Sequence, residues 1–171
     1  DKVSGTSERI PTFVKSFEAF KSASKHNRTL PEGKINFQRF TALDLSKSEW
    51  EKLALNMGWT ATRINLNTFS RHGLYDIKGF TDTITSKLAS KEQVLRSKVF
   101  PYQLMTAYNN VDSSIPVKVK NALQDAMEYA TENIPSFGEN LNIVVAVDSS
   151  GSMSSPITGN RGSATSVTSC N

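Results

Sequence analysis

The chain has 171 residues, and its 37% hydrophobic and 21% charged content is typical of a folded protein rather than a disordered one. No apolar run approaches the roughly 20 residues that cross a bilayer, and the first residues lack the apolar core of a signal peptide, so we expect no membrane partner and a cytoplasmic location. Residues 1–100 hold 17 Lys and Arg against 10 Asp and Glu, which indicates either a phosphate-bearing partner or a basic surface that is simply solvated.

The first predicted helix begins near Pro11, a residue that a first turn tolerates. Phe13, Phe17 and Phe20 follow at i, i+4 and i+7, which places their rings on one stripe that needs a covering surface. The segment HNRTLPEGKINF, residues 26–37, then has the composition of a linker.

A second helix begins after Ser46, because Ser46 and Glu49 have the spacing of a capping box. Its apolar face carries Trp50, Leu53, Ala54 and Met57.

The segment WTATRINLNTFSRHG, residues 59–73, predicts a helical stretch in which Ile64, Leu66 and Phe69 face a core. Gly73 is the expected stop at its C-terminal end. Thr81 and Asp82 are the expected caps of the next helix.

Four further apolar patterns predict the remaining helices. The helix after Thr81 carries Ile84 and Leu88, and residues 91–98 form a short helix. Pro101 begins a helix with Leu104, Met105 and Tyr108 at helical spacing. Pro116 begins the last and clearest one, whose apolar face holds Val119, Leu123, Ala126, Met127 and Ala130.

Successive short amphipathic helices favour a stack of helical pairs, because each pair leaves an apolar face for the next. The pattern changes at Leu141, where LNIVVAV predicts a strand buried on both faces of a parallel sheet. We therefore expect a helical domain over residues 1–134, a linker over residues 135–140 and the start of an α/β domain over residues 141–171.

The loop DSSGSM follows this predicted strand and collects oxygen ligands. Asp148, Ser150 and Ser152 can turn their oxygens toward one point, and Gly151 lets the backbone bend between them. Such donors suit a hard cation, Mg²⁺ or Mn²⁺, although one carboxylate alone binds weakly. The alternative is a serine-rich turn in which Asp148 forms an Asx turn or caps a helix without a metal.

Two resemblances extend this interpretation. The run VVAVDSSGSM resembles the metal-ion-dependent adhesion site of von Willebrand factor A domains. The run LALNMGWTATRINLNTFSRHGLYD, then PYQLMTAY, a last long helix and VVAVDSSGSM, resembles the C-terminal part of a TROVE domain that continues into its A-domain, as in the Ro autoantigen and its bacterial relatives. This second resemblance covers about residues 35–160.

The resemblance implies a mostly α fold. HEAT-like helical repeats of a TROVE domain would precede the first strand and metal loop of an α/β, Rossmann-like von Willebrand factor A domain. The A-domain's later metal ligands are missing from this sequence, so a protein partner or a second chain would complete it. The family's implied partner is small noncoding, Y-type RNA, together with the single-stranded 3′ ends of misfolded RNA, in RNA stability or quality control.

The residues agree with an RNA partner. Arg63, Asn67 and Arg71 fall at i, i+4 and i+8 and predict a polar stripe opposite Ile64 and Phe69, to which Trp59 adds a flat ring. In the alternative, Trp59 lies in the core and the asparagine side chains form hydrogen bonds with neighbouring backbone groups. Lys34 and Arg39 are further candidates for phosphate contacts.

Three functions compete. The first is a non-enzymatic RNA-binding component of a ribonucleoprotein, and the second is a protein-interaction module whose cation at Asp148 captures a partner's carboxylate. A hydrolase using Ser150 or Ser152 is third, because neither lies in a G-x-S-x-G elbow and only His26 and His72 could act as base. The single Cys170 excludes an internal disulfide and a cysteine-based zinc site.

Overall fold

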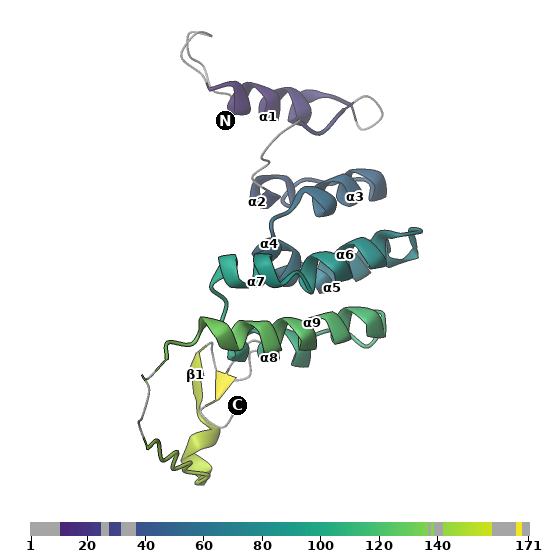
Figure 1. The fold of residues 1–171 in the computed structure, drawn as a ribbon. Coiled ribbons are helices and arrows are strands. Elements are labelled where there is room, and N and C mark those ends of the chain that lie inside the picture. Colours follow the sequence, from purple (N-terminus) through teal and green to yellow (C-terminus); the bar gives the residue numbers. More distant parts are fainter. Residues whose placement is uncertain are drawn as a thin grey trace. The chain divides into compact units, whose positions relative to one another are not determined.

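The computed structural model describes residues 11–24, 28–31, 37–136, 138, 142–158 and 167–168. The described chain is mostly helical (Figure 1). It divides into two compact units, Asp1–Met57 and Gly58–Asn171. No helix among the described residues is long and apolar enough to span a membrane.

The first unit contains α1 (Thr12–Ser22), α2 (Phe37–Phe40) and α3 (Lys47–Asn56). The ring of Phe40 meets two rings of α1 edge to face, with centroids 5.1 Å from Phe17 and 5.3 Å from Phe20. Phe40 is fully buried and Phe20 is almost fully buried. The predicted aromatic stripe on α1 is therefore confirmed, and α2 supplies part of its cover.

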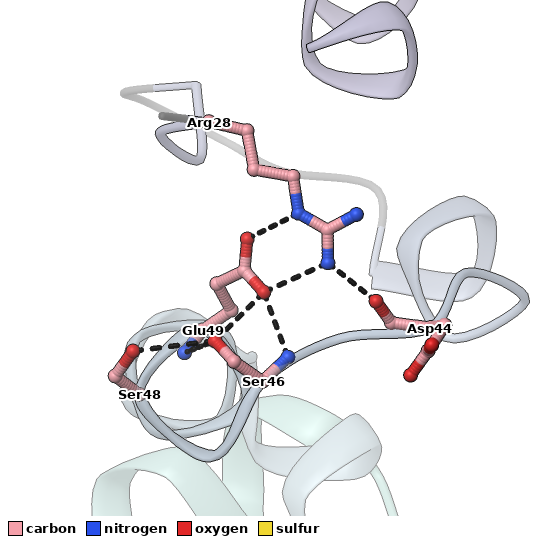
Figure 2. A network of polar contacts seen from close by, with 5 residues as sticks. All are labelled: Arg28, Asp44, Ser46, Ser48 and Glu49. Carbon is pink, nitrogen blue, oxygen red and sulfur yellow. Dashed lines mark hydrogen bonds and ion pairs between the residues drawn. The ribbon is translucent and has the colours of Figure 1, made fainter. Parts of the chain in front are cut away.

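The capping box at the start of α3 is also confirmed, and it is part of a larger polar network (Figure 2). The backbone N–H of Ser46 donates to Glu49 Oε2 over 2.7 Å. Arg28 donates to both oxygens of the same carboxylate, from Nε over 2.6 Å and from Nη2 over 2.9 Å, and Nη2 also donates to the Asp44 carbonyl. Glu49 is only 6% exposed, and its hydrogen bonds from Arg28 lower its pKa to about 2.

The second unit is built around its longest helix. In chain order it contains α4 (Trp59–Ile64), α5 (Leu66–Arg71), the 3₁₀ turn η1 (Leu74–Asp76), α6 (Phe80–Leu88), α7 (Lys91–Ser97), α8 (Pro101–Asn109), α9 (Val117–Ala130) and the 3₁₀ turn η2 (Thr131–Asn133). Helix α9 packs against α6, α7 and α8. Its predicted apolar face is confirmed, because Val119, Leu123 and Ala126 are fully buried.

The stretch predicted as one helix after Trp59 is broken at Asn65. Asn65 has φ −98° and ψ 11°, and its side-chain Nδ2 donates to the Ala61 carbonyl over 2.9 Å, which competes with regular helix bonding. Ile64 is 65% exposed, so its predicted burial is wrong, whereas Leu66 and Phe69 are buried as expected.

Two glycines set the helix boundaries that follow. Gly73 has φ 64°, in the left-handed region, and ends α5 as predicted. Gly79 has φ 82° and precedes α6, so the predicted caps Thr81 and Asp82 lie inside the first turn instead. The negative charge of Asp82 is still stabilising there, because it lies near the positive end of the helix dipole.

The predicted strand over LNIVVAV is wrong for the residues that the structure describes. Residues 142–149 are irregular, and Val144 and Val145 are 90% and 78% exposed. A strand needs neighbours that pair with its backbone, and residues 142–147 join no sheet. The 3₁₀ turn η3 (Gly151–Ser154) follows, and β1 (Pro156–Thr158) pairs antiparallel with β2 (Val167–Thr168), Pro156 opposite Thr168. The predicted A-domain boundary at residues 135–140 stays a prediction.

Candidate nucleic-acid interface

A groove of about 220 Å³ lies between α4, α5 and α8 of the second unit. We call it the interhelical groove and define it by its lining residues, Arg63, Ile64, Leu66, Asn67, Thr106, Ala107, Asn110 and Val111. Ile64, beside the break at Asn65, is one of the apolar lining residues. The polar lining residues come from α4 and α5 on one side of the groove and from α8 and Asn110 on the other. The groove is smaller than the usual site for a drug-sized ligand, so it suits a single flat group or a short side chain.

Arg63 supplies positive charge to the wall of the groove. Its Nη1 donates to the Gln103 carbonyl over 3.0 Å, and its buried Nε has no hydrogen-bond partner. Burial lowers the pKa of this guanidinium from its ordinary value. No carboxylate pairs with Arg63 among the described residues. A half-buried cation without a carboxylate is costly, and an anion bound at the groove would reduce that cost.

Asn67 ties α5 to the turn after α8. Its Nδ2 donates to the Asn110 carbonyl over 2.8 Å, and its Oδ1 accepts from the Asp112 backbone N–H over 3.1 Å. Both ends of the amide are therefore used within the protein. The structure places Arg63 and Asn67 together in the groove, but Ile64, predicted on the opposite face, lines it too, and Asn67 has a structural role there.

Trp59 does not belong to the exposed stripe. Its ring is 5% exposed, and Nε1 donates to the Leu88 carbonyl over 3.1 Å. The predicted stacking of this ring on a base is therefore not available in the structure. The alternative, in which Trp59 is a core residue, describes what is observed, and its polar atom is satisfied inside the core.

Arg71 is the exposed member of the predicted stripe. It ends α5, outside the groove, and its Nη2 donates to Thr68 Oγ1 over 3.1 Å. The neighbouring His72 is exposed, and desolvation together with the charge of Arg71 lowers its pKa. His72 is therefore mainly neutral at pH 7, and Arg71 carries the positive charge at this helix end.

The two remaining RNA candidates come from the first unit. Arg39 is exposed on α2, with its guanidinium 5.5 Å from the centroid of the Phe13 ring. Lys34 lies outside the described residues.

The loop at Asp148 forms a turn. The Ser150 N–H donates to Asp148 Oδ1 over 2.9 Å, and the hydroxyls of Ser150 and Ser152 are 2.9 Å apart. This is the Asx turn that the alternative interpretation expects. Among the three predicted oxygen donors only Asp148 is a carboxylate, and the described residues contain no cluster of three acidic, His or Cys side chains. The Mg²⁺ or Mn²⁺ site with its incomplete ligand set stays a prediction.

Sequence reasoning missed the α8 side of the interhelical groove. Thr106 lies in α8 and Asn110 directly follows it, four residues on, whereas the apolar spacing of Leu104, Met105 and Tyr108 indicates only the buried side of this helix. Thr106 donates to the Tyr102 carbonyl over 2.9 Å, and Asn110 Nδ2 donates to the Thr106 carbonyl over 2.8 Å. The polar i, i+4 spacing of this pair is the signal that could have identified that face.

The comparisons with known proteins give one match. The family model described as the TROVE domain matches residues 37–155, which include α2 to α9 and the loop at Asp148. No curated protein and no solved structure matches the chain at a significant level.

Proposed function

The chain belongs to the TROVE domain family, and from this premise we propose that it is an RNA-binding, non-enzymatic component of a Ro-like ribonucleoprotein. The observation that carries the proposal is the family match over residues 37–155, because TROVE domains are associated with the RNA-binding Ro ribonucleoproteins. At the finer level, we propose small noncoding, Y-type RNA as the partner. Single-stranded 3′ ends of misfolded RNA are the second proposed ligand, and RNA stability or quality control is the proposed role.

The charge distribution supports this proposal. Residues 1–100 hold 17 Lys and Arg against 10 Asp and Glu. In the second unit, Arg63 lines the interhelical groove without a carboxylate among the described residues, and Arg71 is exposed at the end of α5. Phosphate groups are the ligands that such cations bind most readily, because each neutralised phosphate releases a counterion.

The test is a binding titration of the full 171-residue chain with a structured and a single-stranded RNA at several salt concentrations. We expect the logarithm of the affinity to fall linearly with the logarithm of the salt concentration, with a slope of about −0.7 per phosphate contact for a single strand. Failure to bind either RNA at low salt would contradict the proposal.

A pair of variants sharpens the test. Arg71→Ala removes an exposed cation, whereas Lys118→Ala removes a cation that already pairs with Asp82 over 2.9 Å. If Arg71 contacts a phosphate, its loss reduces the salt slope by about one contact's share, and loss of Lys118 leaves the slope unchanged. Equal effects of the two variants would show that general charge, rather than Arg71, determines binding.

A further inference from the structure

The start of α8 exposes two aromatic rings that lie nearly parallel. Phe100 is the residue before the helix and Tyr102 is its second residue, and they are 41% and 46% exposed. Their centroids are 6.3 Å apart, and their planes differ by 16°. We call this pair the aromatic platform. Large aromatic rings are mostly buried in folded proteins, so two exposed parallel rings present flat apolar surface to a partner.

The backbone holds the aromatic platform in place. The Phe100 N–H donates to Gln103 Oε1 over 3.1 Å, and Pro101 fixes the backbone at the first helical position. The residue before the platform, Val99, is 5% exposed, and its carbonyl accepts from Asn133 Nδ2 over 2.9 Å. A platform fixed from both sides loses little conformational entropy when a ligand binds.

Two cations directly precede the rings. Arg96 lies in the last turn of α7, and Lys98 follows that helix with φ 51°. Both are exposed, and neither forms an ion pair within the part of the chain that the structure describes. By contrast, Lys91 at the other end of α7 pairs with Glu132 over 2.6 Å. Positive charge that is not paired in this way therefore precedes the two rings by two and four residues in the chain, counted from Phe100.

We propose that Phe100 and Tyr102 stack on bases of single-stranded RNA while Lys98 and Arg96 bind the flanking phosphates. The inference rests on the proposed RNA-binding function and names a surface for it, at the start of α8 (Figure 1). Proteins that bind single strands without sequence preference combine aromatic stacking surfaces with cations that follow the backbone. A purely apolar protein-docking face would need the hydrophobic area but neither the ring planes nor the cations.

The experiment separates ring planarity from hydrophobicity. In the full chain, Phe100→Leu and Tyr102→Leu keep an apolar side chain but remove the flat ring. The probe is a fluorescently labelled, single-stranded oligouridylate, titrated at several salt concentrations. We expect each Leu variant to lose roughly 5- to 100-fold in affinity with an unchanged salt slope, because stacking is lost while phosphate contacts remain.

Three further variants serve as controls. Tyr102→Phe keeps the ring and should bind as the wild type does. Met105→Leu alters a neighbouring residue of α8 that is 38% exposed, and should also leave binding unchanged. Lys98→Ala should reduce the salt slope by about one contact's share. Thermal melting of every variant separates lost binding from lost folding.

Each outcome decides between the proposals. If the wild type binds RNA and both Leu variants bind it as tightly as the wild type does, the stacking proposal is overturned while the proposed RNA binding stands. An apolar docking face for a protein would then be the better interpretation of the aromatic platform. If Tyr102→Phe binds as weakly as Tyr102→Leu, stacking is overturned as well. If the wild type binds no RNA at any salt concentration, both this inference and the proposed function fail.

Discussion

The carboxylate of Glu49 makes the stability of the first unit depend on pH. Its pKa is lowered to about 2 by Arg28, whereas a carboxyl group in the unfolded chain titrates near its ordinary value of about 4.3. The folded state therefore binds this proton less readily than the unfolded state does. The stabilisation is fully present above the unfolded pKa, near pH 5 and higher, and is lost as the pH falls toward about 2.

Glu49→Gln should remove this dependence and lower the free energy of unfolding at pH 7 by roughly 2 kcal/mol, since charge-assisted hydrogen bonds to a buried group are lost. The difference between wild type and variant should shrink as the pH falls from about 5 to 2, because protonated Glu49 resembles glutamine. Urea unfolding followed by tryptophan fluorescence measures it. The control is Glu92→Gln, at an exposed position of α7. A difference that stays constant down to pH 2 would contradict the assigned network of Figure 2.

At Asn67, the structure and the sequence assign different roles to one side chain. Asn67→Ala removes two hydrogen bonds to residues 110–112 and should cost roughly 1–2 kcal/mol of stability, with faster hydrogen exchange at the Asp112 amide. If Asn67 instead contacts RNA as the sequence predicts, the variant loses RNA affinity and keeps its stability. Asn109→Ala, at an exposed position of α8, is the matched control.

At the scale of elements, helix faces were predictable where a strong local signal agrees with tertiary packing. The capping box at Ser46 and the left-handed Gly73 act through backbone geometry that neighbouring residues largely determine, and both are confirmed. The break at Asn65 was not predictable from apolar spacing, because an Asn side chain can bond a backbone carbonyl either within or against a helix. The exposure of Ile64 was not predictable from that spacing either, because it depends on which helices pack against α4.

The candidate site was predictable only in part, for a related reason. Arg63 and Asn67 do line the interhelical groove together, but Ile64, which was expected on the opposite face, lines it as well, and Arg71 does not. The spacing could not show that Trp59 points into the core, because exposed and buried faces of a short helix depend on which helices pack against it. For the same reason, the sequence of residues 59–73 alone could not show that α8 forms one side of the interhelical groove.

The turn at Asp148 supports a prediction about metal binding. Three oxygen donors with one carboxylate should bind Mg²⁺ or Mn²⁺ only weakly, with a Kd on the order of 1 mM or higher. Asp148→Ala should abolish even this binding, which calorimetric titration of the full chain would detect. Asp148→Asn keeps an acceptor for the Ser150 N–H and serves as the control for the turn. Micromolar binding would contradict this prediction.

On the scale of the whole molecule, the apolar residues divide into two groups. The helices of the second unit bury most of their large apolar side chains, with Leu104, Leu123 and Phe69 fully covered. The segment 142–147 does the reverse, because Ile143 and Val147 are 59% and 79% exposed. A run of exposed apolar residues is costly in water and exposes backbone that another strand could pair with. The helices therefore account for the stability of this unit, and the segment contributes little to it.

Removal of residues 141–171 should consequently leave the melting temperature within about 2 °C of the full chain, since residues 142–155, where the structure describes burial, are mostly exposed. The same truncation should reduce concentration-dependent association, because it removes the exposed apolar segment. Circular dichroism melts and light scattering at several protein concentrations measure the two effects. As a control, Leu123→Ala in the buried face of α9 should cost roughly 2–5 kcal/mol and lower the melting temperature strongly. A truncated chain that melts as early as the Leu123 variant would show that residues 141–171 pack against the helices.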